Sequence, residues 1–186
     1  MKRMDLIHQL SSLERRGISV FTRCDLEKVF PDEDEKTMGK SLQRMVGDGL
    51  LIKAARGVYA YGLASPEHQR WRIEEVAQAL RPGKLCYLSL ESMLSEYGVI
   101  SQIPVDRLTV MTEGAGGIHK TPFGVIEFTY TKRVVPDILD RTFSVEGRPL
   151  RLAKKWAAVQ DLRRVGRNVD MMDPDELADL NMEDAS

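Results

Sequence analysis

Cysteine is scarce in this chain of 186 residues, because Cys24 and Cys86 are the only two and neither belongs to a Cys-x-x-Cys pair or a Cys/His cluster. Both lie among apolar residues, so we expect reduced, structural thiols and neither a disulfide framework nor a zinc site. No apolar run approaches the roughly 18 residues that span a bilayer, and the N-terminus has no signal-peptide core. We therefore expect a cytoplasmic protein with no membrane partner.

An excess of charge of either sign is also missing, since 27 Lys plus Arg face 28 Asp plus Glu and the net charge is −1. This balance conceals a segregation, because residues 170–186 carry seven acidic side chains and no basic one. Without them the chain would carry a charge of +6, which favours an anionic partner for the rest. With 42% hydrophobic residues, the chain can bury a core. We expect two small domains and an acidic tail, at residues 1–64, 65–169 and 170–186.

The N-terminal domain shows the element order of a winged helix-turn-helix. Apolar residues at helical spacing predict a first helix over residues 4–14, and Thr22 with Asp25 forms a capping-box pattern at the start of a second. A third helix is expected over residues 34–48, followed by a hairpin over residues 50–61. Three helices followed by a hairpin are typical of a DNA-binding module whose third helix enters the major groove.

The expected third helix has two opposed faces. At 100° per residue, Met38, Leu42, Met45 and Val46 gather on one side, and basic or amide side chains gather on the other. The polar side chains that we expect to meet the duplex are Lys36, Lys40, Gln43 and Arg44, with Arg23, Lys53 and Arg56 as phosphate contacts. Among these, Gln43 can pair with adenine and Arg44 with guanine.

Two observations oppose a DNA-binding face. Residues 32–35 are all acidic, so they suit the start of a helix but would repel phosphate, and the DNA-facing positions must begin at Lys36 or later. A basic stripe can also be an ordinary solvated face, and winged helices also serve as protein-binding modules. These alternatives stay open at the level of the sequence.

The C-terminal domain is expected to be α+β with a mostly antiparallel sheet. Helices are predicted over residues 66–80, 90–97 and 153–166, and strands over residues 85–88, 107–112, 124–131, 142–145 and 150–152. The last helix and the segment before it are rich in cations, namely Arg148, Arg151, Lys154, Lys155, Arg163, Arg164 and Arg167. These cations predict either a solvated face that neutralises the acidic tail or a second basic surface. A short closing helix is expected after residue 173.

No enzyme motif can be identified. Residues 114–121 end in Lys-Thr, as a phosphate-binding loop does, but His119 stands where that loop needs glycine and no helix follows. We therefore predict a flexible hairpin loop there. His8 and His68 have no partner at a recognisable spacing, so we expect no catalytic residue, metal or cofactor, with a hydrolase or transferase built around His119 and Lys120 as the alternative.

Three segments of the second domain resemble the AbiEi family of antitoxins. They are Tyr-Leu-Ser-Leu-Glu-Ser from Tyr87, Leu-Thr-Val-Met-Thr from Leu108 and Thr-Pro-Phe-Gly-Val-Ile-Glu-Phe from Thr121. The N-terminal pattern that ends in Gly57-Val58-Tyr59 is similar too. The resemblance covers most of residues 1–165. By their residue types these segments are mainly scaffold, with Ser89 and Glu91 expected to cap a helix start.

The resemblance implies a type IV antitoxin. Such a protein represses its own operon by binding the double-stranded DNA of its promoter, which we expect to contain inverted repeats. It opposes a nucleotidyltransferase-like toxin encoded beside it and need not bind that toxin directly. The alternative function is a partner-binding module that uses the winged helix as scaffold and the basic C-terminal helix to engage an acidic protein. For the acidic tail we predict weak autoinhibition of DNA binding.

Overall fold

The computed structural model describes residues 2–100 and 106–172. The chain divides into an N-terminal unit, Met1–Pro82 with Thr121–Phe123, and a C-terminal unit made of the described residues of Gly83–Lys120 and Gly124–Ser186. The closing helix predicted after residue 173 and most of the acidic tail lie outside the described residues. Within the described part, no helix has both the length and the apolar character that crossing a membrane requires.

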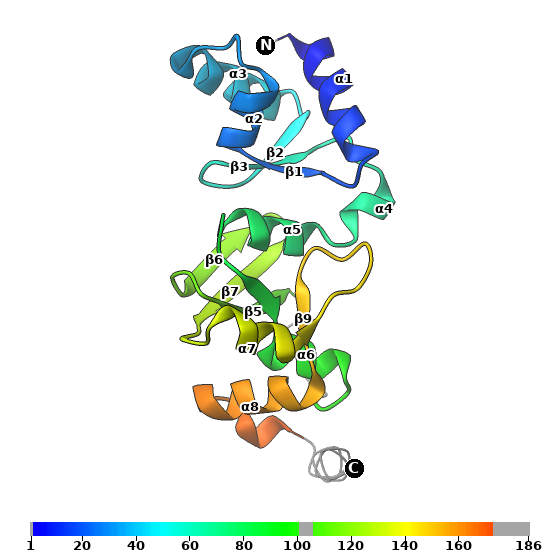
Figure 1. The fold of residues 1–186 in the computed structure, drawn as a ribbon. Helices are drawn as coiled ribbons and strands as arrows, with labels where there is room; N and C mark the ends of the chain where they lie inside the picture. Colours follow the sequence, from blue (N-terminus) through cyan, green and yellow to red (C-terminus); the bar gives the residue numbers. More distant parts are fainter. Residues whose placement is uncertain (1, 101–105, 173–186) are drawn as a thin grey trace. The chain divides into compact units, whose positions relative to one another are not determined.

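The first part of the N-terminal unit, residues 3–61, has three helices on one side of a three-stranded antiparallel sheet (Figure 1). Its elements are α1 (Arg3–Glu14), β1 (Val20–Thr22), α2 (Arg23–Val29), α3 (Glu35–Gly47), β2 (Leu51–Ala55) and β3 (Val58–Tyr61). β3 is central and pairs with β1 and β2. The β2–β3 turn passes through Gly57 at a φ of +73°, a conformation that favours glycine. The element order is the one predicted.

One apolar core joins these helices to the sheet. Leu6 and Leu10 of α1 and Met38 of α3 are fully buried, since residues three or four apart share a helix face. Fully burying such a side chain stabilises the fold by about 1.5–3 kcal/mol. The predicted capping box is present at α2, where the Thr22 and Asp25 side chains each accept a hydrogen bond from the other residue's backbone amide. These contacts fix the helix that precedes α3.

The segment predicted as the start of the second domain packs on the first. It forms two short helices, α4 (Pro66–Gln69) and α5 (Arg72–Ala79), and α5 contacts β1 and β3. The compact N-terminal unit therefore extends to Pro82, not to residue 64.

Side chains far apart in the sequence make this attachment. The Glu14 carboxylate accepts from the Ser65 amide at 2.7 Å and lies 3.0 Å from His68 Nδ1. The Ser65 hydrogen bond is the main reason that the pKa of Glu14 lies below its usual value. The Ser19 hydroxyl donates to Glu75 at 2.6 Å, and burial raises the pKa of Glu75. Contacts across some 50 residues leave no local signal, whereas the helix start at Ser65-Pro66, before which the boundary was predicted, is a local one.

The C-terminal unit contains a six-stranded sheet in the order β6-β7-β5-β4-β9-β8. Its strands are β4 (Cys86–Leu88), β5 (Arg107–Thr112), β6 (Gly117–Thr121), β7 (Gly124–Tyr130), β8 (Thr142–Phe143) and β9 (Arg151–Ala153). The pairs β4/β5 and β8/β9 are antiparallel, whereas β5/β7 and β4/β9 are parallel. Over both sheets antiparallel pairing prevails and the α+β class is confirmed, but the parallel pairs were not predicted.

Three helices accompany this sheet, namely α6 (Leu90–Glu96), α7 (Val135–Asp140) and α8 (Lys155–Val165). α6 packs against both β5 and α8. The hairpin loop predicted over residues 114–121 is wrong, because Gly117–Thr121 forms the edge strand β6. Nearby glycines favoured a loop, but pairing with β7 decides the structure. The helix α7 was also missed, because it starts with Val-Pro and proline usually breaks a helix. In the first turn, where this proline lies, it is tolerated.

Candidate nucleic-acid interface

α3 starts at a well-capped end. Asp34 Oδ1 accepts from the backbone amides of Lys36 and Thr37, both at 3.0 Å, and Oδ2 accepts from the Thr37 hydroxyl at 2.6 Å. The Thr37 hydroxyl is the main reason that the pKa of Asp34 lies below its usual value. The charged cap also suits the positive end of the helix, so Asp34 has a structural role here.

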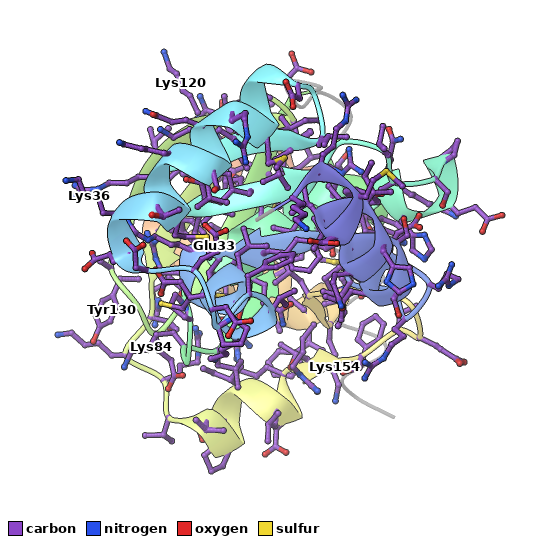
Figure 2. The ribbon with its side chains drawn as sticks, turned by 90° about the horizontal axis from the view of Figure 1, so that it is seen from above. Glu33, Lys36, Lys84, Lys120, Tyr130 and Lys154 are labelled. Atoms are coloured by element: carbon purple, nitrogen blue, oxygen red, sulfur yellow. The ribbon has the colours of Figure 1, made fainter. Side chains whose placement is uncertain are left out.

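The two predicted faces of α3 are present. Met38, Leu42 and Met45 are at most 2% exposed. All four predicted DNA-facing side chains of α3 are exposed, namely Lys36, Lys40, Gln43 and Arg44. Lys36 extends away from the helix (Figure 2). Together they cover about 12 Å along the helix axis, which is comparable to the width of the major groove.

The acidic run beside this face has internal partners. Glu33 accepts a hydrogen bond from the Ser41 hydroxyl at 3.1 Å, and Asp34 caps the helix. Glu35 lies near the Arg23 guanidinium, with 3.5 Å between Oε1 and the nearest nitrogen. Three of the four acidic residues therefore have a structural partner, which reduces the repulsion of phosphate that the sequence led us to expect.

Arg23 differs from its predicted role as a phosphate contact. Its Nε donates to Glu27 Oε1 at 2.8 Å, and this bond is the main reason that the pKa of Arg23 lies above its usual value. Its backbone amide donates to the Gly57 carbonyl at 2.8 Å, so the start of α2 is joined to the hairpin turn. Lys53 and Arg56 on the hairpin are exposed, as a phosphate contact requires. Arg23 would therefore approach DNA with two carboxylates beside it.

The cations of the second basic surface predicted in the C-terminal unit divide into paired arginines and exposed side chains, and Arg164 belongs to both groups. Arg148 pairs with Glu96, Arg151 donates to Thr142 and Ser144, Arg164 reaches the Thr131 hydroxyl at 3.4 Å, and Arg167 pairs with Glu91 and Glu127. Lys154 and Arg163 are exposed, and Lys155 is half-buried. The reason is chemical, since guanidinium groups form strong directed bonds with carboxylates. Most of these arginines hold the unit together.

A fully buried carboxylate connects α8 to the sheet. Asp161 Oδ2 accepts from the hydroxyls of Tyr87 at 3.1 Å and Ser89 at 2.9 Å. Asp161 Oδ1 lies 2.7 Å from an Arg133 nitrogen and 3.2 Å from an Arg141 nitrogen. Burial, together with the charge of Asp161, raises the pKa of Tyr87 well above its usual value, so this hydroxyl remains a donor. Two hydroxyls and two guanidinium groups thus surround one carboxylate.

A second cluster holds the end of α8. Arg167 Nε lies 2.9 Å from Glu91 Oε1, and the same guanidinium pairs with Glu127, which also pairs with Arg107 at 2.7 Å. The expectation that Ser89 and Glu91 cap α6 is wrong, because their side chains bind Asp161 and Arg167 instead. Alternate residues of the Tyr-Leu-Ser-Leu-Glu-Ser segment therefore hold α8 in place.

Sequence reasoning missed Asp161 and its two arginines, Arg133 and Arg141. A signal was available for Asp161, because an acidic residue stood between Ala158 and Leu162 on the side of the predicted helix that faces inward. A charge on a buried face requires a partner. No local pattern identifies the two arginines, since they lie about 20 or more residues earlier in the chain.

Two of the three histidines have defined neighbours in the described structure. Both Glu14 and the Ser65 hydroxyl approach the same ring atom of His68, Nδ1, whereas a relay needs one partner at each ring nitrogen. The His119 ring packs edge-on against Phe128, with 5.5 Å between the ring centres. In residues 2–100 and 106–172, no group of three His, Cys, Asp or Glu residues could hold a metal ion. Cys24 is exposed and Cys86 is buried.

Comparison with known proteins identifies a similar fold. No model of a known protein family matches the chain, and no curated protein matches it in sequence. The crystal structure of the Rv2827c protein from Mycobacterium tuberculosis is similar, with a TM-score of 0.50 and 16% sequence identity. The match covers 83% of this chain and 58% of that protein, so this chain spans less than two thirds of its length. At this identity the likeness concerns the fold alone.

Proposed function

We propose that the N-terminal unit is a winged helix-turn-helix that binds double-stranded DNA, with α3 in the major groove and the β2–β3 hairpin as the wing. The observation that carries this proposal is the exposed face of α3, where Lys36, Lys40, Gln43 and Arg44 stand opposite a buried apolar face. Lys53 and Arg56 extend the cationic surface onto the hairpin. In this reading, Gln43 and Arg44 contact base edges and the lysines contact phosphates.

The whole chain is, in this proposal, an AbiEi-like type IV antitoxin that represses its own operon. The support is the family resemblance, together with the role of its most specific segment in holding α8. The alternative of a partner-binding module keeps the exposed cations Lys154, Arg163 and Arg164, whereas Arg148, Arg151 and Arg167 have partners inside the C-terminal unit. In the proposal, the C-terminal unit acts against a nucleotidyltransferase-like toxin.

A titration of the purified protein tests DNA binding. The probes are a duplex from the region upstream of its own gene and a scrambled duplex of the same composition, each at about 50 and 200 mM salt. Specific binding that weakens steeply with salt supports the proposal. Equal affinity for both duplexes, or none for either, overturns it.

The antitoxin half has its own test. The gene beside this one is expressed in a host cell with and without this chain, and growth is followed. Restored growth in the presence of the chain supports the proposal, and growth arrest that the chain does not relieve contradicts it. A pull-down of the two proteins then separates direct contact from an indirect effect.

A further inference from the structure

Gly39 is a glycine within α3 that the fold does not require. Its backbone is helical, and a Cβ atom built on it would have no other atom within 4 Å. Gly62 shows the contrast, since a Cβ there would collide with the Gly49 carbonyl. A glycine inside a helix is less favourable than alanine by about 0.5–1 kcal/mol. The chain thus keeps a destabilising residue in α3 for which no intramolecular contact gives a reason.

The position of Gly39 on the helix is informative. On an ideal helix it lies about 85° from the centre of the face formed by Lys36, Lys40, Gln43 and Arg44. Lys36 precedes it by three residues and Gln43 follows it by four, so both are its neighbours on the helix surface. Thr37 occupies the opposite flank. Gly39 therefore forms a flat flank beside the proposed DNA-facing side chains.

The dimensions of DNA indicate what this flank of α3 would contact in the major groove. A helix with its side chains is about 10–12 Å across, and the major groove is about 12 Å wide. When the basic face points at the base edges, the flanks of the helix lie against the sugar–phosphate walls of the groove. A missing side chain on one flank lets the helix backbone approach that wall closely.

We propose that Gly39 is the point where the α3 backbone packs against the DNA backbone, so that its lack of a side chain sets the depth and tilt of the helix in the groove. This inference rests on the proposed function and adds to it a steric contact. It explains why a residue that weakens the helix is found beside Lys36 and Gln43. Any side chain at this position would move the helix away from the wall and lengthen the contacts of its neighbours.

The test compares two substitutions at one position, Gly39→Ala and Gly39→Val. Alanine favours the helix more than valine does, whereas valine adds the larger side chain. A general stiffening of α3 is therefore greater in Gly39→Ala, and a steric contact with DNA is greater in Gly39→Val. Urea unfolding measures stability, and fluorescence anisotropy measures affinity for a duplex selected from a random library by the unchanged protein.

We expect Gly39→Ala to raise the urea midpoint and to weaken DNA binding about tenfold, as steric overpacking would. Gly39→Val should bind DNA more weakly still, because its side chain is larger. Unchanged affinity in Gly39→Ala would overturn the inference while leaving the proposed function intact, and so would a smaller loss in Gly39→Val than in Gly39→Ala, since this would indicate a general effect of stiffening α3. If the unchanged protein selects no duplex, the proposed function fails and this inference fails with it.

Discussion

Replacing Asp161 by alanine should severely destabilise the C-terminal unit. The carboxylate is fully buried and accepts from two hydroxyls, and two guanidinium groups lie within 3.2 Å of it. Removing one partner of a buried ion pair costs about 3–5 kcal/mol, because the remaining charges stay buried without compensation. The free energy of unfolding falls by about 2 kcal/mol for each molar of urea, so the urea concentration at the unfolding midpoint should fall by about 2 M.

Tryptophan fluorescence can follow this unfolding locally. Trp156 lies on α8 with the Arg141 guanidinium 4.7 Å from its ring centre, and Trp71→Phe would leave it as the only tryptophan. The matched control is Tyr87→Phe, which removes one hydroxyl from the same carboxylate and should cost less, about 1.5–3 kcal/mol. If Asp161→Ala proves no more destabilising than Tyr87→Phe, the buried cluster does not hold α8 and our reasoning is refuted.

Two further substitutions probe the N-terminal unit. Glu35→Gln removes a negative charge beside the proposed DNA face, and this charge is also a partner of Arg23. DNA affinity should therefore rise severalfold at about 50 mM salt and by less at about 200 mM. An affinity that does not rise in an anisotropy titration would count against the assigned face. Glu14→Gln should lower the free energy of unfolding by about 1 kcal/mol at pH 7, measured in urea, because the amide oxygen can still accept from Ser65 but carries no charge. Folding lowers the pKa of Glu14, so its contribution is full above the unfolded value of 4.5 and is lost as the pH falls through the folded pKa. The two stability curves should therefore converge in acid, and parallel curves would contradict the role of Glu14.

The sequence predicted those elements whose signals are local. α3 was predicted within a residue or two, because opposed faces, an aspartate cap and a closing Gly-Asp-Gly all lie inside one segment. The hairpin after it was predicted from its glycine turn. The exposed residues of α3 followed from the same periodicity, since a helix with one buried face must expose the other.

The rest depends on contacts between distant residues. Nothing near residue 65 reveals that Glu14 and Ser19 hold α4 and α5 on the first unit. The parallel β5/β7 pair and the edge strand β6 depend on partners that local propensity does not specify. The partners of the basic residues 148–167 could not be predicted for the same reason, because Arg148 and Arg167 pair with carboxylates on other elements.

The central claim is that α3 binds DNA with its exposed face, and the salt dependence of binding tests it most directly. The measurement compares Lys40→Ala plus Arg44→Ala in α3 with Lys154→Ala plus Arg163→Ala, an equal loss of exposed charge in the C-terminal unit. We predict that the α3 variant folds normally, loses about 1–3 kcal/mol of specific binding for each base contact removed and shows a reduced salt slope, whereas the control binds as the unchanged protein does. Equal affinities of the two variants would contradict the claim.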